Sequence, residues 1–190
     1  DLLILGAILL ALVAVFARDL GHRATTLDDE AIVFANPVQQ HFGLHELREA
    51  LDPRASRLAY GLQYTPVRDL SHALDVRLFG DDAGLHHLQP LLLHALATIA
   101  LFVLMRRLGG PPGAAGIAAL VFATHPLQVE SVAWISGRTV PLAGALLLWT
   151  LVAWQRARSS GGAGAWTAAL VLFVLANLAK QSAVLMVGML

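Results

Sequence analysis

The segment LQPLLLHALATIALFVLM, Leu88–Met105, contains no charged residue and is followed at once by Arg106 and Arg107. A transmembrane helix needs about 17–25 predominantly apolar residues, so this segment is long enough to cross a membrane. Further uncharged apolar runs follow the same pattern, and a sixth span begins at residue 181; these runs cover residues 2–17, 113–124, 139–155 and 163–179. The sequence therefore predicts an all-α protein, a polytopic transmembrane helical bundle.

The composition supports this class. Hydrophobic residues make up 57% and charged residues 14% of the chain, whereas soluble domains have about 25% charged residues. The net charge is zero, which gives no argument for nucleic acid as a partner. The absence of cysteine excludes disulfides, cysteine-based metal sites and thiol nucleophiles within these residues. Because the chain starts without methionine and stops inside an apolar run, we expect it to be part of a longer protein.

The short loops predict the orientation in the membrane. The loops after residues 105 and 155 carry arginines and no acidic residue, so the positive-inside rule places both in the cytoplasm together with the N-terminus. The first run, residues 2–17, is short for a span; a signal peptide is the alternative, but the basic segment typical of one does not precede it. The long loop 18–87, the turn 125–138 and Lys180 then lie on the external side.

The external loop 18–87 holds 11 of the 13 acidic residues and 6 of the 8 histidines, and loops of this length are usually functional. Leu70, Leu74 and Leu78 recur with the spacing of an amphipathic helix, and Phe42–Leu51 predicts a second short helix. Both helices could lie on the membrane surface with the apolar face down. Packing of these leucines against the spans is the other interpretation.

The external ends of the spans gather polar residues. Asp28 and Asp29 follow the first span; a carboxylate there could act as a general base, bind a metal ion, cap a helix or simply be solvated. Arg138 has the donor geometry to bind a phosphate, or it could pair with Glu130. Lys180, the one lysine in the chain, is either a snorkelling anchor or a phosphate contact.

The remaining histidines and the common sequence motifs give less information about the chemistry. His94 lies within the second apolar run, where a hydrogen-bonded histidine is a better interpretation than a ligand. His86 and His87 precede that run, and a metal site there is the less favoured interpretation; a divalent metal is an alternative cofactor that the sequence does not indicate. The chain contains no HExxH, GxSxG or Walker motif, which removes the commoner hydrolase and ATPase interpretations.

Five segments, in order, resemble one family. They are DDEAIVFANP, YTPVRDLSHALDVRLFG, HHLQPLLLHAL, FATHPLQVESVAWISGRTVPLAG and LAKQSAV. Together they resemble the GT-C superfamily of polytopic glycosyltransferases, and within it the transmembrane O-mannosyltransferases with C-terminal tetratricopeptide repeats and their bacterial relatives. Two positions depart from the family pattern: Gln89 stands where the family usually has Asn, and Gln181 where an acid is frequent.

The resemblance implies residue roles. Asp28 would be the catalytic base that takes the proton from an acceptor hydroxyl, and Asp29 would assist or orient it. Arg138, Lys180 and His125 would contact the phosphate of a lipid donor as charge develops on it. Glu130 would orient Arg138, and Arg68 would be a further contact.

The resemblance also implies a function. The chain would move a sugar, mannose or another hexose, from a polyprenyl-phosphate donor to a protein Ser or Thr or another hydroxyl acceptor on the external face, with no cofactor beyond the lipid-linked sugar. The arginine-rich composition indicates a bacterial inner membrane; in a eukaryote the endoplasmic reticulum membrane would be expected. A non-catalytic scaffold or transporter-like protein with the same fold is the alternative. Clustering of polar residues at span ends, rather than at mid-membrane, favours the transferase.

Overall fold

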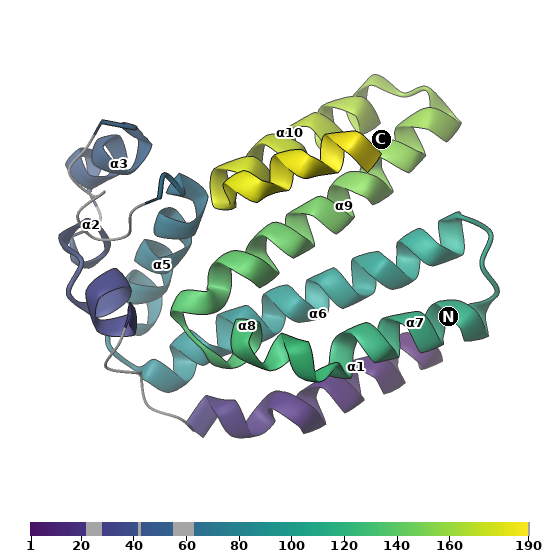
Figure 1. The fold of residues 1–190 in the computed structure, drawn as a ribbon, viewed down its shortest axis with the longest axis horizontal. Coiled ribbons are helices and arrows are strands. Elements are labelled where there is room, and N and C mark those ends of the chain that lie inside the picture. Colours follow the sequence, from purple (N-terminus) through teal and green to yellow (C-terminus); the bar gives the residue numbers. More distant parts are fainter. Residues whose placement is uncertain (22–27, 42, 55–62, 190) are drawn as a thin grey trace.

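The computed structural model describes residues 1–21, 28–41, 43–54 and 63–189. Over these ranges the regular structure is helical, with no strand, which confirms the all-α prediction (Figure 1). An α-helix occupies each of the first five predicted apolar runs; these helices are α1 (Leu2–Phe16), α6 (Ala83–Arg107), α7 (Pro112–Thr124), α9 (Thr139–Ser160) and α10 (Ala163–Ala179). The segment predicted to begin a sixth span forms a 3₁₀ helix, η5 (Gln181–Met189).

Two of these helical segments are long and apolar enough to cross a membrane, Ala83–Arg107 and Ser136–Ser160. Helices α1, α7 and α10 are apolar but shorter, with 15, 13 and 17 residues. The predicted spans at residues 88–105 and 139–155 thus fall inside the two long helices. The helical content and two candidate spans support a membrane protein.

The helix ends follow from local sequence. The side chain of Asp82 accepts hydrogen bonds from the backbone N–H groups of Gly84 (2.9 Å) and Leu85 (3.3 Å), which caps the N-terminus of α6. Helix α7 begins with Pro112, a position where the missing N–H has no intrahelical partner. Gly161 ends α9 in the left-handed conformation with φ of 65°, which a residue with a side chain adopts less readily. The two short arginine-bearing turns are therefore defined by proline and glycine.

Small residues allow the long helices to pack closely. Ala115, Ala119 and Ala123 recur every fourth residue on α7 and are fully buried. A Cβ atom added to Gly116 would lie 2.8 Å from Cγ2 of Ile4, so α1 and α7 approach closely there. The core between them also includes larger side chains from α1 and α6, namely Ile8, Leu12, Phe16, Leu91 and Phe102. Membrane helices commonly pack through small residues in this way, because in lipid there is no hydrophobic driving force between apolar side chains and close van der Waals contact must drive association.

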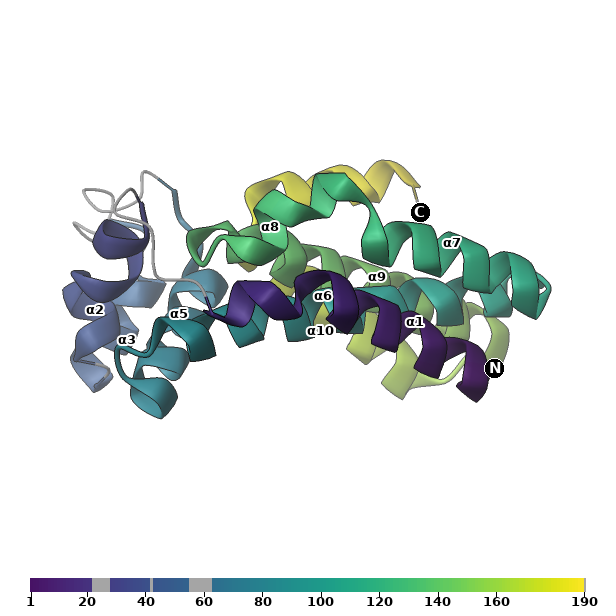
Figure 2. The same ribbon diagram turned by 90° about the horizontal axis from the view of Figure 1, so that it is seen from below.

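The bundle has two chemically different ends (Figures 1 and 2). One end carries the N-terminus and the turns between α6 and α7 and between α9 and α10; there Arg106 Nε lies 3.2 Å from a carboxylate oxygen of Asp1. We call it the arginine end. The other end carries the acidic segment, and we call it the loop end; it comprises η1 (Ala17–Gly21), η2 (Glu30–Phe34), α2 (Pro37–Gln40), α3 (Leu44–Leu51), α5 (Pro66–Phe79), η3 (Pro126–Gln128), α8 (Val129–Ala133) and η4 (Ser136–Arg138).

The two helices predicted in the external loop are present as α5 and α3. Helix α3 begins at Leu44, and Phe42 lies outside the described residues. On α5 the last two leucines of the stripe face outward: Leu74 is 50% and Leu78 is 62% exposed. These two leucines therefore do not pack against the spans, whereas Leu70 is half-buried. Helix α5 instead turns its polar face into the protein, where Arg68, Asp69, His72, Ala73 and Asp75 are buried.

Candidate functional site

The acidic pair is fixed to the loop end through its second member. Asp29 is fully buried, and its Oδ1 accepts hydrogen bonds from the backbone N–H of Ser136 (2.9 Å) and from its hydroxyl (2.6 Å). These bonds connect the segment before η2 to η4, more than one hundred positions later in the chain. Hydrogen bonds to an ionised carboxylate are short and about twice as strong as neutral ones. Asp29 therefore holds the acidic segment to η4 in this structure.

Asp28, in contrast, is exposed. The two neighbouring carboxylates thus differ in surroundings: one is held by the protein and the other faces outward. A general base must reach the proton that it abstracts, and of the two only Asp28 meets that condition here. The arrangement fits the roles implied by the resemblance, which stay predictions.

Arg138 lies at the centre of the buried polar residues. It is fully buried and forms an ion pair with Asp75 of α5. Its Nη2 donates to the backbone carbonyl of His86 (3.2 Å), and its Nη1 donates to the hydroxyl of Ser71 (3.4 Å). The guanidinium thereby joins η4 to α5 and to the N-terminus of α6.

The expected pairing of Arg138 with Glu130 is wrong. Glu130 is exposed on α8, whereas Arg138 points into the protein, where burial of its charge requires a carboxylate at close range. Asp75 supplies that carboxylate. The burial also means that Arg138 does not present its donors to a ligand in this structure.

One hydrogen bond and one longer contact extend the cluster from Arg138. The hydroxyl of Ser71 donates to Oε1 of Gln89 at 3.0 Å while it accepts from Arg138. Gln89 is one of the two positions that depart from the family pattern, and here it holds α5 to α6. Nδ1 of His86 lies 3.8 Å from Oδ2 of Asp75. We call Arg138, Asp75, Ser71, Gln89, His86 and His72 the buried polar cluster.

Burial affects the protonation of His72, one of the two histidines in this cluster. Desolvation lowers the pKa of His72 well below its ordinary value of 6.5, and the positive charges of Arg138 and Arg68 lower it further. His72 is therefore neutral at pH 7. Burial also raises the pKa of Asp75, while the neighbouring guanidinium of Arg138 acts in the opposite direction.

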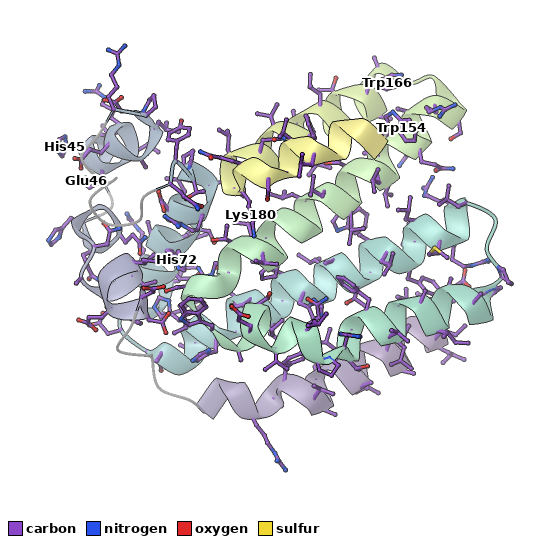
Figure 3. The ribbon with its side chains drawn as sticks, in the orientation of Figure 1. His45, Glu46, His72, Trp154, Trp166 and Lys180 are labelled. Carbon is purple, nitrogen blue, oxygen red and sulfur yellow. The ribbon has the colours of Figure 1, made fainter. Side chains whose placement is uncertain are left out.

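The other predicted cations lie around this cluster. Nε and Nη2 of Arg68 donate to the same carboxylate oxygen of Asp69, at 2.9 and 2.7 Å, and both residues are buried on α5. Lys180 follows the last residue of α10 and is half-buried. Figure 3 shows it at the end of α10 that approaches α5, the helix that carries His72. Within the described ranges, no carboxylate lies within ion-pair distance of Lys180.

His125 occupies the exposed turn after α7. Its Nδ1 accepts a hydrogen bond from the backbone N–H of Leu127 at 3.2 Å, which caps η3. The structure gives no contact between His125 and the buried polar cluster. His94 forms the expected bundle hydrogen bond, with its Nε2 3.1 Å from the carbonyl oxygen of Ala123.

A polar cleft lies beside the acidic segment. It has a volume of about 380 Å³ and is lined by Glu30, Phe34, Gln40 and Asp81. Its two carboxylates and one amide could accept hydrogen bonds from hydroxyl groups. In the part of the chain that the structure describes, no three histidine or acidic side chains converge as metal ligands.

Sequence reasoning missed Asp75, Ser71 and Ser136. A signal for the first two was present, since Ser71 and Asp75 are four residues apart and therefore share one face of α5. That face adjoins the leucine stripe, since Ser71 and Asp75 each directly follow a leucine and successive residues lie about 100° apart around a helix. The leucines favoured an interpretation based on the apolar face, whereas the contacts to Arg138 come from the neighbouring polar face.

The comparisons with known proteins identify partial relatives. No family model and no solved structure matches the chain. It is 35% identical over 102 residues to protein O-mannosyl-transferase TMTC1 of Mus musculus and 27% identical over 128 residues to protein O-mannosyl-transferase TMTC3 of the same organism. These alignments cover 53% and 66% of this chain but only 11% and 14% of the relatives. The chain thus resembles a short part of the protein O-mannosyl-transferases of this group, in agreement with its motifs.

Proposed function

We propose that the chain forms part of a multi-pass membrane glycosyltransferase that moves a hexose from a polyprenyl-phosphate donor to a hydroxyl acceptor on the external face. One observation carries the proposal: an exposed carboxylate, Asp28, adjoins a buried one, Asp29, that is clamped to Ser136. The relatives named protein O-mannosyl-transferase support the reaction class and a protein acceptor.

The proposed reaction uses Asp28 as the base. The acceptor oxygen forms a bond to C1 of the sugar, the bond between C1 and the phosphate oxygen breaks, and the lipid phosphate leaves with the electron pair. Asp28 takes the proton of the acceptor hydroxyl. Asp29 is a positioning residue, because its two hydrogen bonds to Ser136 hold the backbone of its neighbour. The acceptor approaches through the cleft lined by Glu30 and Asp81, beside the acidic segment.

The donor phosphate is assigned to Lys180. Lys180 is half-buried, lies at the end of α10 next to α5 and has no acidic partner among the described residues. A cation there stabilises negative charge as the phosphate leaves. Arg138, which was expected to bind the phosphate directly, acts instead through the framework that it builds with Asp75. Arg68 is likewise engaged by Asp69, and His125 and Glu130 lie on the exposed turn.

The orientation follows from the two ends of the bundle. The positive-inside rule places the arginine end in the cytoplasm, so the loop end faces the periplasm in a bacterium or the lumen of the endoplasmic reticulum in a eukaryote. A lipid phosphate resides at the membrane surface, and a protein acceptor arrives from water. Base and cation must therefore meet at the loop end.

A donor-specificity assay tests the proposal. The protein in lipid nanodiscs is given a serine- and threonine-containing acceptor peptide with either polyprenyl-phosphate hexose or a nucleotide-linked hexose. Transfer from the lipid donor alone is expected. Lys180→Gln should raise the KM for the lipid donor, while Arg77→Gln, an exposed cation on α5, should leave the KM unchanged. Transfer from the nucleotide sugar alone would contradict the donor class, and binding of both substrates without transfer would favour the scaffold alternative.

A further inference from the structure

The arginine end contains a cleft that the proposed reaction does not use. It lies between α6, α9 and α10 and has a volume of about 660 Å³, within the range of about 300–1,000 Å³ typical of ligand pockets. Arg107 and Arg156 stand at its polar end, and Val103, Trp149 and Leu172 line its apolar part. We propose that this cleft binds an anionic phospholipid of the cytoplasmic leaflet.

Charge at the cleft is unbalanced. The turns 106–112 and 156–162 contain no acidic residue, and the one carboxylate described at this end, that of Asp1, is engaged by Arg106. Arg107 and Arg156 are exposed and have no carboxylate within ion-pair distance in the described ranges. Two planar guanidinium groups with free donors are well suited to a phosphate.

Arg107 is also held in place. Its Nη1 lies 3.5 Å from Oε1 of Gln155, and Nε2 of Gln155 donates to the backbone carbonyl of Arg107 at 3.3 Å. These contacts join the end of α6 to the end of α9. They bring the two arginines to one cleft although the residues are 49 positions apart in the sequence.

The apolar part of the cleft extends away from the arginines along the helices. Val103 precedes Arg107 by about one helical turn, and Trp149 precedes Arg156 by about two. On α10, Ala165, Ala168 and Leu172 share one face and line the third wall. The two alanines leave room for a chain. A charged mouth above an apolar wall matches a phosphate headgroup with its acyl chain, and basic pockets between membrane helices on the cytoplasmic side bind such lipids.

The tryptophans indicate where the cleft lies relative to the membrane surface. Trp154 and Trp166 lie at the arginine end (Figure 3), and Trp149 lines the cleft itself. Tryptophan is enriched at the boundary between membrane and water, where phospholipid headgroups are found. Arg158 provides an internal comparison, because its guanidinium stacks over the ring of Trp154 at 4.8 Å and does not line the cleft.

Native mass spectrometry of the detergent-solubilised protein, titrated with phosphatidylglycerol or phosphatidylcholine, tests the proposal. Phosphatidylglycerol should bind more tightly than phosphatidylcholine. The double variant Arg107→Gln/Arg156→Gln should lose about thirtyfold in phosphatidylglycerol affinity, roughly fivefold for each arginine. Arg158→Gln is the matched control, since it removes one arginine charge two residues from Arg156 but outside the cleft. The affinity of this variant for phosphatidylglycerol should be unchanged.

A second variant tests the contribution of the apolar wall separately from that of the arginine charges. Ala168→Trp fills the apolar wall at an exposed position and keeps both arginines, so it should also weaken binding, with helicity unchanged by circular dichroism. Inorganic phosphate at millimolar concentration should not displace the lipid. Equal binding of both lipids, displacement by phosphate, an equal loss in Arg158→Gln or full binding in Ala168→Trp would each overturn the proposal.

Discussion

The charged residues discussed at the two ends of the bundle have opposite surroundings. At the loop end Arg138, Asp75 and Asp29 are buried, and each is held by partners from a distant segment. At the arginine end Arg107, Arg156 and Arg158 are exposed, and the turns that carry them contain no acid. Charges that position a site must be fixed and therefore paired, whereas charges that face headgroups need only reach the membrane surface. The following predictions, in order of decreasing effect, test this difference.

The largest effect is expected for Asp75→Ala. The substitution leaves the guanidinium of Arg138 buried without a carboxylate, and breaking a buried pair in this way costs about 3–5 kcal/mol. Chemical unfolding in detergent micelles measures the loss. The double variant Asp75→Leu/Arg138→Met removes both charges and should recover most of the stability. Wild-type stability in Asp75→Ala would show that the pair does not hold the loop end together.

The next effect is expected for Ser136→Ala. It removes one of the two hydrogen bonds to Asp29, and hydrogen bonds to charged groups contribute about 1.5–3 kcal/mol. Asp29→Asn and the double variant complete a double-mutant cycle, which should show coupling between the two positions. Strictly additive losses would mean that the clamp is not formed.

A pH dependence is expected from His72. Its pKa in the folded protein is below 6.5, so the unfolded chain takes up the proton first as the pH falls. The contribution of His72 to stability is therefore complete above pH 6.5 and is lost as the pH falls below that value, with a slope of at most about 1.4 kcal/mol per pH unit. Unfolding followed between pH 8 and pH 5 measures it. His72→Phe should flatten this part of the curve, and an unchanged slope would exclude His72 as its source.

The smallest effect is expected at the arginine end. Asp1 and Arg106 form a pair whose side chains are 47% and 33% exposed, and exposed pairs contribute about 0.2–1 kcal/mol. Arg106→Gln should therefore change stability by less than any of the preceding variants. A loss as large as that of Asp75→Ala would remove the distinction between the two ends.

The sequence predicted the helices better than the site. Uncharged runs such as Leu88–Met105 define helices whatever their neighbours are, because the spacing and length of apolar residues are local properties. The partner of Arg138 is not a local property. Glu130 was the nearer acid in sequence, but the fold of α5 brings Asp75 to the guanidinium instead.

The different surroundings of Asp28 and Asp29 show the same limit of prediction from the sequence. Two adjacent carboxylates look equivalent in the sequence, and only the position of Ser136, 107 residues later, distinguishes them. The leucine stripe on α5 likewise predicted a helix correctly and gave no indication of which face is buried. Periodicity determines that a helix has two faces, whereas the rest of the fold determines where each face lies.

The role of Asp28 is the central claim, and a comparison of Asp28→Asn with Glu30→Gln tests it most directly. Both residues are exposed acids of the same segment, so each change removes one carboxylate at nearly the same place. Transfer from polyprenyl-phosphate hexose to an acceptor peptide is measured at saturating donor. With the acceptor saturating as well, Asp28→Asn should lower kcat by about 10²–10⁴-fold, as loss of a general base does, with unchanged stability. Glu30→Gln alters only the cleft through which the acceptor approaches, so it should change the KM for the acceptor and retain most of kcat. Full activity in Asp28→Asn, or an equal loss in both variants, would contradict the assignment of the base.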